Sequence, residues 1–140
     1  MHRSTTLRGI STISFYAADL EAAKQWYTEF LGIKPYFEVP GYLEFRVGDY
    51  QHELGIIDRR YAPAGNSDQP AGSVTYWHVD QLEHTLERLI SLGAKAYQPI
   101  RALTKGFVIA SVVDPFGNIL GIMSNPHYLE ILESKNTIQL

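Results

Sequence analysis

Of the side chains in this sequence, those of Glu53 and His78 are best suited to proton transfer on an organic molecule. A carboxylate and an imidazole can both accept or donate a proton near neutral pH. Each residue has two interpretations. Glu53 is either a functional carboxylate or a solvated strand residue paired with Arg46. His78 is either a binding or proton-transfer residue or a core or rim histidine bonded to a backbone carbonyl. We treat Glu53 and His78 as the candidate catalytic residues.

Tyrosines supply the second kind of candidate. Because strand side chains alternate between two faces, Tyr16, Tyr42 and Tyr76 are expected on the same faces as Glu53 and His78. Tyrosine rings can stack on a planar ligand and hydrogen-bond to it, although any single ring could instead fill the core. Beside Arg46, the group predicts a site for an aromatic or carboxylated small molecule. The predicted ligand-binding residues are Tyr16, Tyr42, Arg46, Glu53, Tyr76 and His78.

The residues do not predict a metal site. His52 and Glu53 are adjacent on one strand, so their side chains point to opposite faces and cannot chelate one ion together. A relocated site built on Glu53 and His78 would lack a third ligand. His84 lies among charged neighbours inside a predicted helix, which indicates a solvated position. We therefore expect no metal and no other cofactor.

The composition limits the classes of function. The 140 residues match one ordinary domain with a sizeable core. A formal charge of −3 disfavours nucleic acid or an anionic membrane as the main partner. The sequence has no cysteine, no apolar run long enough to cross a bilayer and no signal-peptide pattern. We expect a cytoplasmic protein.

The first half of the chain reads as strand, helix and three strands. Alternation predicts a strand over residues 10–17, and Asp19 is a good N-cap for a helix that ends at Gly32. Three further strands are predicted over residues 35–39, 42–47 and 50–58. A loop over residues 59–72 then separates this first module, residues 10–58, from the rest.

The second half repeats the pattern over residues 73–125. A strand over 73–79, a helix capped by Asp80 and stopped at Gly93, and a short strand over 95–99 precede a hairpin over 107–124. The hairpin turn, DPFG at residues 114–117, has the residue types of a type I turn. At a fixed offset of 61, Asp19 matches Asp80, and Gly32 matches Gly93. The fold class is therefore α+β, with two tandem βαβββ modules in a single domain and a C-terminal tail over 126–140 that forms a short helix.

A duplicated βαβββ chain that ends in VVDPFGNILGI resembles the vicinal oxygen chelate superfamily. This superfamily includes glyoxalase I, bleomycin-resistance proteins, fosfomycin-resistance enzymes and extradiol dioxygenases. The resemblance rests on SFYAADLEAA, YWHVDQLEHTLERLISLGAK and the DPFGN hairpin, and it covers residues 10 to about 125. It implies a U-shaped mixed sheet around a ligand pocket and a homodimer.

The resemblance also implies four metal-ligand positions, on the first, fourth, fifth and eighth strands. Carried over by motif, they fall on Thr12, Glu53, Val74 (Ser73 if the count slips by one) and Gly121. Only Glu53 keeps a ligating side chain of the expected type, so the family's metal cage is absent. The residues and the resemblance together favour a metal-free binder of a small organic molecule, of the bleomycin-resistance type. The alternative is a lyase, isomerase or dioxygenase of the superfamily that uses Glu53 and His78 for proton transfer or a relocated metal site.

Overall fold

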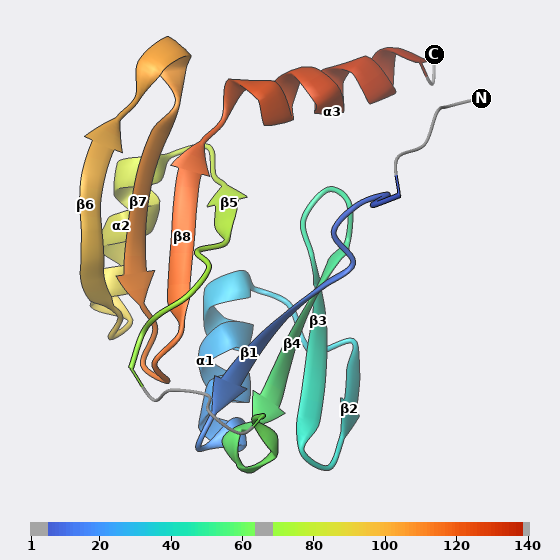
Figure 1. The fold of residues 1–140 in the computed structure, drawn as a ribbon, viewed down its shortest axis with the longest axis vertical. Helices are drawn as coiled ribbons and strands as arrows, with labels where there is room; N and C mark the ends of the chain where they lie inside the picture. Colours follow the sequence, from blue (N-terminus) through green and yellow to red (C-terminus); the bar gives the residue numbers. More distant parts are fainter. Residues whose placement is uncertain (1–5, 64–68, 139–140) are drawn as a thin grey trace. The chain divides into compact units, whose positions relative to one another are not determined.

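The chain forms two β-sheets with four strands each, one in each half of the sequence (Figure 1). The computed structural model describes residues 6–63 and 69–138. The chain divides into two compact units, Met1–Asn66 and Ser67–Leu140, which we call module 1 and module 2. In the described residues, no helix is long and apolar enough to cross a membrane.

Module 1 contains one long helix and four strands. Its elements are β1 (Thr12–Ala17), α1 (Leu20–Leu31), β2 (Phe37–Val39), β3 (Tyr42–Val47) and β4 (His52–Asp58), followed by a short 3₁₀ helix (Arg59–Tyr61). The strand order is β1-β4-β3-β2, with β1 parallel to β4 and the other pairs antiparallel. β1 and β4 can pair in parallel because a long connection, which contains α1, β2 and β3, joins them.

One face of the first sheet packs against α1. The buried helix residues Ala23 and Tyr27 face this sheet, and the Tyr27 ring lies 6.3 Å from that of Phe15 and 6.5 Å from that of Phe45. The Asp19 side chain accepts a hydrogen bond from the Ala22 backbone N–H at 3.0 Å, as an N-cap does. Gly32 ends the helix in the left-handed conformation, with φ 74°. Both predicted helix boundaries are confirmed.

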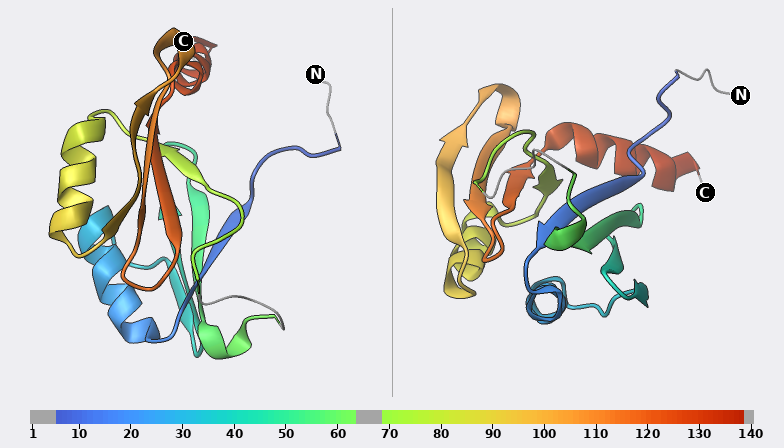
Figure 2. Two further views of the ribbon diagram at one scale, coloured as in Figure 1. Left: turned by 60° about the vertical axis from the view of Figure 1, so that its left-hand side comes forward. Right: turned by 60° about the horizontal axis from the view of Figure 1, so that its bottom comes forward.

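Module 2 repeats the arrangement and adds a C-terminal helix (Figure 2). Its elements are β5 (Tyr76–His78), α2 (Leu82–Ser91), β6 (Lys95–Ala102), a 3₁₀ turn (Thr104–Gly106), β7 (Val108–Val113), β8 (Ile119–Ser124) and α3 (Pro126–Ile138). The strand order is β5-β8-β7-β6, with β5 parallel to β8. α2 lies along one face of this sheet, where Leu89, Ala110, Val112 and Ile122 are buried.

The predicted DPFG hairpin is present between β7 and β8. The buried Asp114 carboxylate accepts hydrogen bonds from the backbone N–H groups of Phe116 (2.9 Å) and Asn118 (2.8 Å). The Gly117 N–H also bonds to the Asp114 carbonyl, and Gly117 has φ 96°. A positive φ explains why glycine stands at this position.

The α+β class and the two tandem modules are confirmed, and several details differ from prediction. Asp80 does not cap α2: the N-cap is Gln81, which makes no side-chain capping hydrogen bond. β6 continues to Ala102 instead of ending near Pro99, and the tail forms a helix of 13 residues rather than a short one. The predicted linker begins with a 3₁₀ turn, and its residues 64–68 lie outside the described part of the chain. The single domain and the U-shaped surface around a pocket stay predictions.

Candidate functional site

The face of the first sheet that α1 leaves uncovered carries all the predicted site residues of module 1. Strand pairing places Thr12, Glu53 and Arg46 in one row across β1, β4 and β3. The next two rows are Ser14, Gly55 and Glu44, then Tyr16, Ile57 and Tyr42. We call this surface open face 1. The predicted assignment of Tyr16, Tyr42, Arg46 and Glu53 to one face is confirmed by this register.

Glu53 is held in place by its neighbour in β1. The Thr12 hydroxyl donates a hydrogen bond to Glu53 Oε1 at 2.7 Å. Arg46 stands opposite Glu53 in β3, but its guanidinium lies over the Tyr36 ring, 3.7 Å from the ring centroid. The Arg46 side chain thus makes a cation–π contact. A fixed, partly exposed carboxylate therefore stands beside an aromatic ring and a cation.

Tyr42 lies across the sheet, over the space that Gly55 leaves empty. Its hydroxyl donates a hydrogen bond to Glu44 Oε1 at 2.6 Å. A Cβ atom on Gly55 would come within 2.7 Å of the Tyr42 hydroxyl oxygen. Burial, followed by the hydrogen bond to Glu44 and the negative charges of Glu44 and Glu53, raises the pKa of Tyr42 to about 12. Tyr42 is therefore a protonated hydrogen-bond donor throughout the neutral range.

The face of the second sheet that α2 leaves uncovered, open face 2, carries a polar row that spans all four strands. Tyr76, Gly121, Ser111 and Gln98 stand side by side on β5, β8, β7 and β6. Gln98 Oε1 accepts hydrogen bonds from the hydroxyls of Tyr76 (3.1 Å) and Ser111 (2.9 Å). Tyr76 was predicted as a site residue, whereas Gln98 and Ser111 were not. Irregular pairing between β6 and β7 brings Gln98 opposite Ser111, and simple alternation cannot show this.

His78 is tied to the start of the C-terminal helix. Its Nδ1 accepts a hydrogen bond from the Asn125 backbone N–H at 3.1 Å, and its ring stacks on Tyr128 with a centroid distance of 5.0 Å. Its Nε2 lies 3.5 Å from Asp80 Oδ1. These contacts fit the core-histidine interpretation, with a backbone N–H in place of the expected carbonyl. Glu53 and His78 stand in different modules, and their joint role stays a prediction.

The family's metal cage does not fit the residues present. The residue paired with Gly121 is Tyr76, whereas Val74 precedes the first residue of β5. A Cβ on Gly121 would lie 2.7 Å from the Tyr76 ring and 2.8 Å from the Thr75 carbonyl oxygen. The Tyr76 ring thus occupies the space where a carboxylate side chain of the eighth strand would begin. No group of three or more His, Asp or Glu side chains in the described residues could hold a metal ion.

A family model matches residues 9–122, and it describes the Glyoxalase/Bleomycin resistance protein/Dioxygenase superfamily. This chain belongs to that superfamily. The match covers both modules and the DPFGN hairpin, and it confirms the resemblance seen in the sequence. No curated protein sequence matches the chain well enough to count as a relative.

Solved structures of superfamily proteins show the same fold. A glyoxalase-related enzyme from Fulvimarina pelagi matches with a TM-score of 0.68 and 24% identity, over 86% of this chain and 90% of that one. A lactoylglutathione lyase from Agrobacterium tumefaciens matches with a TM-score of 0.66 and 18% identity, over 86% and 96%. A Nocardioides glyoxalase/bleomycin resistance protein/dioxygenase matches with a TM-score of 0.62 and 20% identity, over 86% and 85%. At these identities the likeness concerns the fold, which serves many functions.

Proposed function

We propose that this superfamily member binds a small organic molecule on an uncovered sheet face, without the family's metal centre. The observation that carries the proposal is the Tyr76 ring lying over Gly121, where the family would place a metal-binding carboxylate. Of the carried-over ligand positions, only Glu53 has a strongly ligating side chain, and its Oε1 accepts a hydrogen bond from Thr12. One carboxylate alone does not hold Zn²⁺, Ni²⁺ or Fe²⁺ against water.

The residues in place of the cage suit an organic ligand. Open face 1 offers the rings of Tyr42 and Phe37, whose centroids lie 6.4 Å apart, next to the Glu44 carboxylate. Open face 2 offers Tyr76 and the Gln98 amide. Aromatic surface with a few oriented polar groups is the usual lining of a small-molecule site.

Elemental analysis of the purified, dialysed protein tests the metal-free part of this proposal. We expect far less than one divalent ion per chain, in the parent and in the Glu53→Gln variant alike, with Glu83→Gln on α2 as a matched control. About one ion per chain in the parent and in the control, lost in Glu53→Gln, would establish a metalloenzyme instead. Binding itself is measured as thermal stabilisation by added aromatic compounds, which should weaken in a Tyr76→Leu variant.

The ordered Glu53 carboxylate favours a second candidate, an enzyme that moves a proton on a carbonyl substrate. A carboxylate fixed at 2.7 Å from the Thr12 hydroxyl is already oriented for proton abstraction. A superfamily lyase or isomerase of this kind would exchange the proton next to a carbonyl with solvent deuterium. Loss of that exchange in Glu53→Gln, with ligand binding retained, would establish the enzyme.

A further inference from the structure

Gln98 is the one amide in the polar row of open face 2, and its hydrogen bonds fix what it can offer to a ligand. Its Oε1 already accepts hydrogen bonds from Tyr76 and Ser111. An amide oxygen has two lone pairs, so these two bonds use its accepting capacity. The two N–H groups on Nε2 remain, and Gln98 is an exposed residue. In this arrangement Gln98 acts toward a ligand as a donor only.

The surroundings of Gln98 hold that orientation. Ser111 is fully buried, so its hydroxyl has to find a partner inside the protein. Two strands lie between Tyr76 and Gln98, and Tyr76 reaches across because Gly121, on the first of them, has no side chain to block its ring. A network with both hydroxyls satisfied is rigid, which lowers the entropic cost of binding a ligand.

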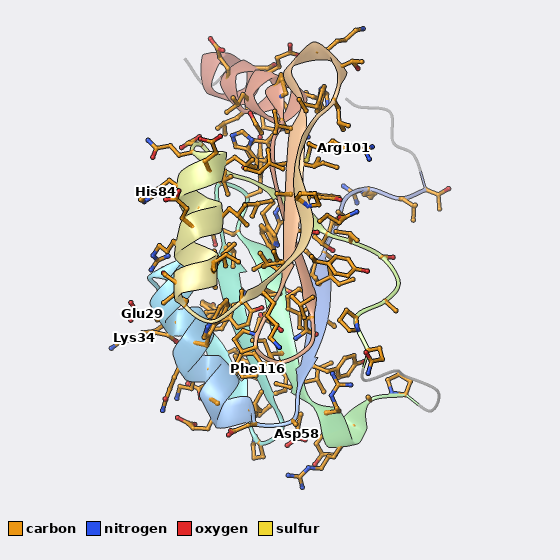
Figure 3. The ribbon with its side chains drawn as sticks, turned by 90° about the vertical axis from the view of Figure 1, so that its left-hand side faces the viewer. Glu29, Lys34, Asp58, His84, Arg101 and Phe116 are labelled. Carbon is orange, nitrogen blue, oxygen red and sulfur yellow. The ribbon has the colours of Figure 1, made fainter. Side chains whose placement is uncertain are left out.

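The two charged residues of β6, Lys95 and Arg101, are both positive. Strand pairing puts Lys95 opposite Val113 and Arg101 opposite Ile109, on the same face as Ser111 and Gln98. Figure 3 shows Arg101 on the side of β6 that faces away from α2 and its His84. Each cation is three residues from Gln98, roughly 10 Å along a strand, so it attracts an anion without contacting it.

We propose that Gln98 binds the carboxylate of an aromatic ligand through its Nε2 hydrogens, with the Tyr76 ring against the ligand's aromatic part. This inference rests on the proposed binding function and names the ligand class that the second module recognises. A carboxylate accepts hydrogen bonds only, so it matches a group that can only donate. The positive charges of Lys95 and Arg101 favour a carboxylate over a neutral carbonyl.

Benzoate and benzylamine, which have similar shapes and opposite charges, test the inference by NMR titration. We expect benzoate to shift the Gln98 side-chain amide signals and benzylamine to leave them unchanged. Gln98→Glu keeps an acceptor for Tyr76 and Ser111 but turns a negative charge toward the ligand, so benzoate affinity should fall about tenfold or more. Gln81→Glu, with the same charge change at the start of α2, should keep benzoate affinity within about twofold.

The outcomes separate this inference from the proposed function. Benzoate bound equally by the parent and Gln98→Glu, with shifts confined to module 1, would overturn the role of Gln98 and leave a binding protein. Failure of both probes to bind either open face at millimolar concentration would overturn both. The amide signals of the parent give a readout that does not depend on the variant's folding.

Discussion

At the scale of single residues, the two modules share one arrangement: a tyrosine ring lies over a glycine on the uncovered face of the sheet. In module 1, Tyr42 covers Gly55 and bonds to Glu44. In module 2, Tyr76 covers Gly121 and bonds to Gln98. Neither glycine adopts a positive φ. Both are therefore explained by the space that the rings need, rather than by backbone conformation.

The Tyr42 hydroxyl should titrate well above an ordinary tyrosine. Its pKa is raised from 10.0 to about 12, first by burial and then by Glu44 and Glu53. The unfolded chain releases this proton near pH 10 and the folded chain near pH 12, so the free energy of unfolding should fall as pH rises between these values. NMR titration of the tyrosine ring carbons measures the pKa directly.

Glu44→Gln should bring the Tyr42 pKa part of the way back, because burial remains as the largest cause. Glu83→Gln on α2 is the matched control and should leave the Tyr42 titration unchanged. A Tyr42 pKa near 10 in the parent protein would contradict the half-buried, hydrogen-bonded position of its hydroxyl.

The two glycines should differ in their tolerance of a methyl group. The three atoms nearest to a Cβ on Gly55 would all belong to the far end of the Tyr42 side chain, which can swing away. A Cβ on Gly121 would meet the Tyr76 ring at 2.7 Å and the backbone oxygen of Thr75 at 2.8 Å, and a backbone atom cannot rotate away. We expect Gly121→Ala to lower the free energy of unfolding by about 1–3 kcal/mol and Gly55→Ala by less than about 1 kcal/mol. Urea denaturation measures both values, and a reversed order would refute this account.

The sequence predicts which residues share a face of the sheet more reliably than it predicts which side chains are in contact. Period-two alternation correctly placed Tyr42 and Arg46 on one face of their strand, and the pairing register adds Glu53 and Tyr16 from the neighbouring strands. It could not predict that Thr12 bonds to Glu53, since that contact depends on the parallel pairing of β1 with β4. Gln98 was missed because β6 pairs irregularly with β7.

At the scale of elements, the two central helices begin in different ways despite their matching sequences. The offset of 61 aligns Asp19 with Asp80, and both residues are good N-caps by type. Only Asp19 accepts the capping hydrogen bond. α2 begins one residue later relative to this alignment, with Gln81 as its cap. A repeat in the sequence predicts that a helix is present more reliably than it predicts the first residue of that helix.

The two aspartates therefore form a matched pair of substitutions. Asp19→Ala removes a bond to the Ala22 N–H at the start of α1 and should cost about 1 kcal/mol of stability. Asp80→Ala removes no cap, and its side chain is 91% exposed, so its cost should stay below about 0.5 kcal/mol. Urea denaturation of both variants checks the difference, and equal losses would show that Asp80 caps α2 after all.

At the scale of the whole molecule, each module has its own core and its own uncovered sheet face. The core of module 1 is built around Tyr27 and Phe45, and that of module 2 around Leu89 and Ile122. The helices α1 and α2 cover only one face of each sheet. The remaining faces each carry residues that we propose for ligand binding, so the duplicated fold provides two related but chemically different surfaces.

The C-terminal helix leads to the last prediction, a homodimer. The resemblance seen in the sequence implies a homodimer, and α3 exposes Leu129 (44%) and Ile131 (42%). An exposed apolar side chain gains free energy when another surface covers it. We expect sedimentation at micromolar concentration to give twice the 15.8 kDa mass of one chain.

Substitution of both apolar residues tests whether α3 forms that contact. Residues two apart lie on different sides of a helix, so whichever side of α3 faces the partner would bury a carboxylate in the double variant Leu129→Glu, Ile131→Glu. This variant should sediment as a single chain, because burying a carboxylate in an interface costs far more than leaving it in water. Ile90→Glu on α2 replaces an apolar residue of similar exposure, 43%, and should keep the dimer. A parent protein that sediments near 15.8 kDa would refute the dimer itself. A dimer that survives the double substitution would place the contact elsewhere, because a buried negative charge in each chain would otherwise separate the partners.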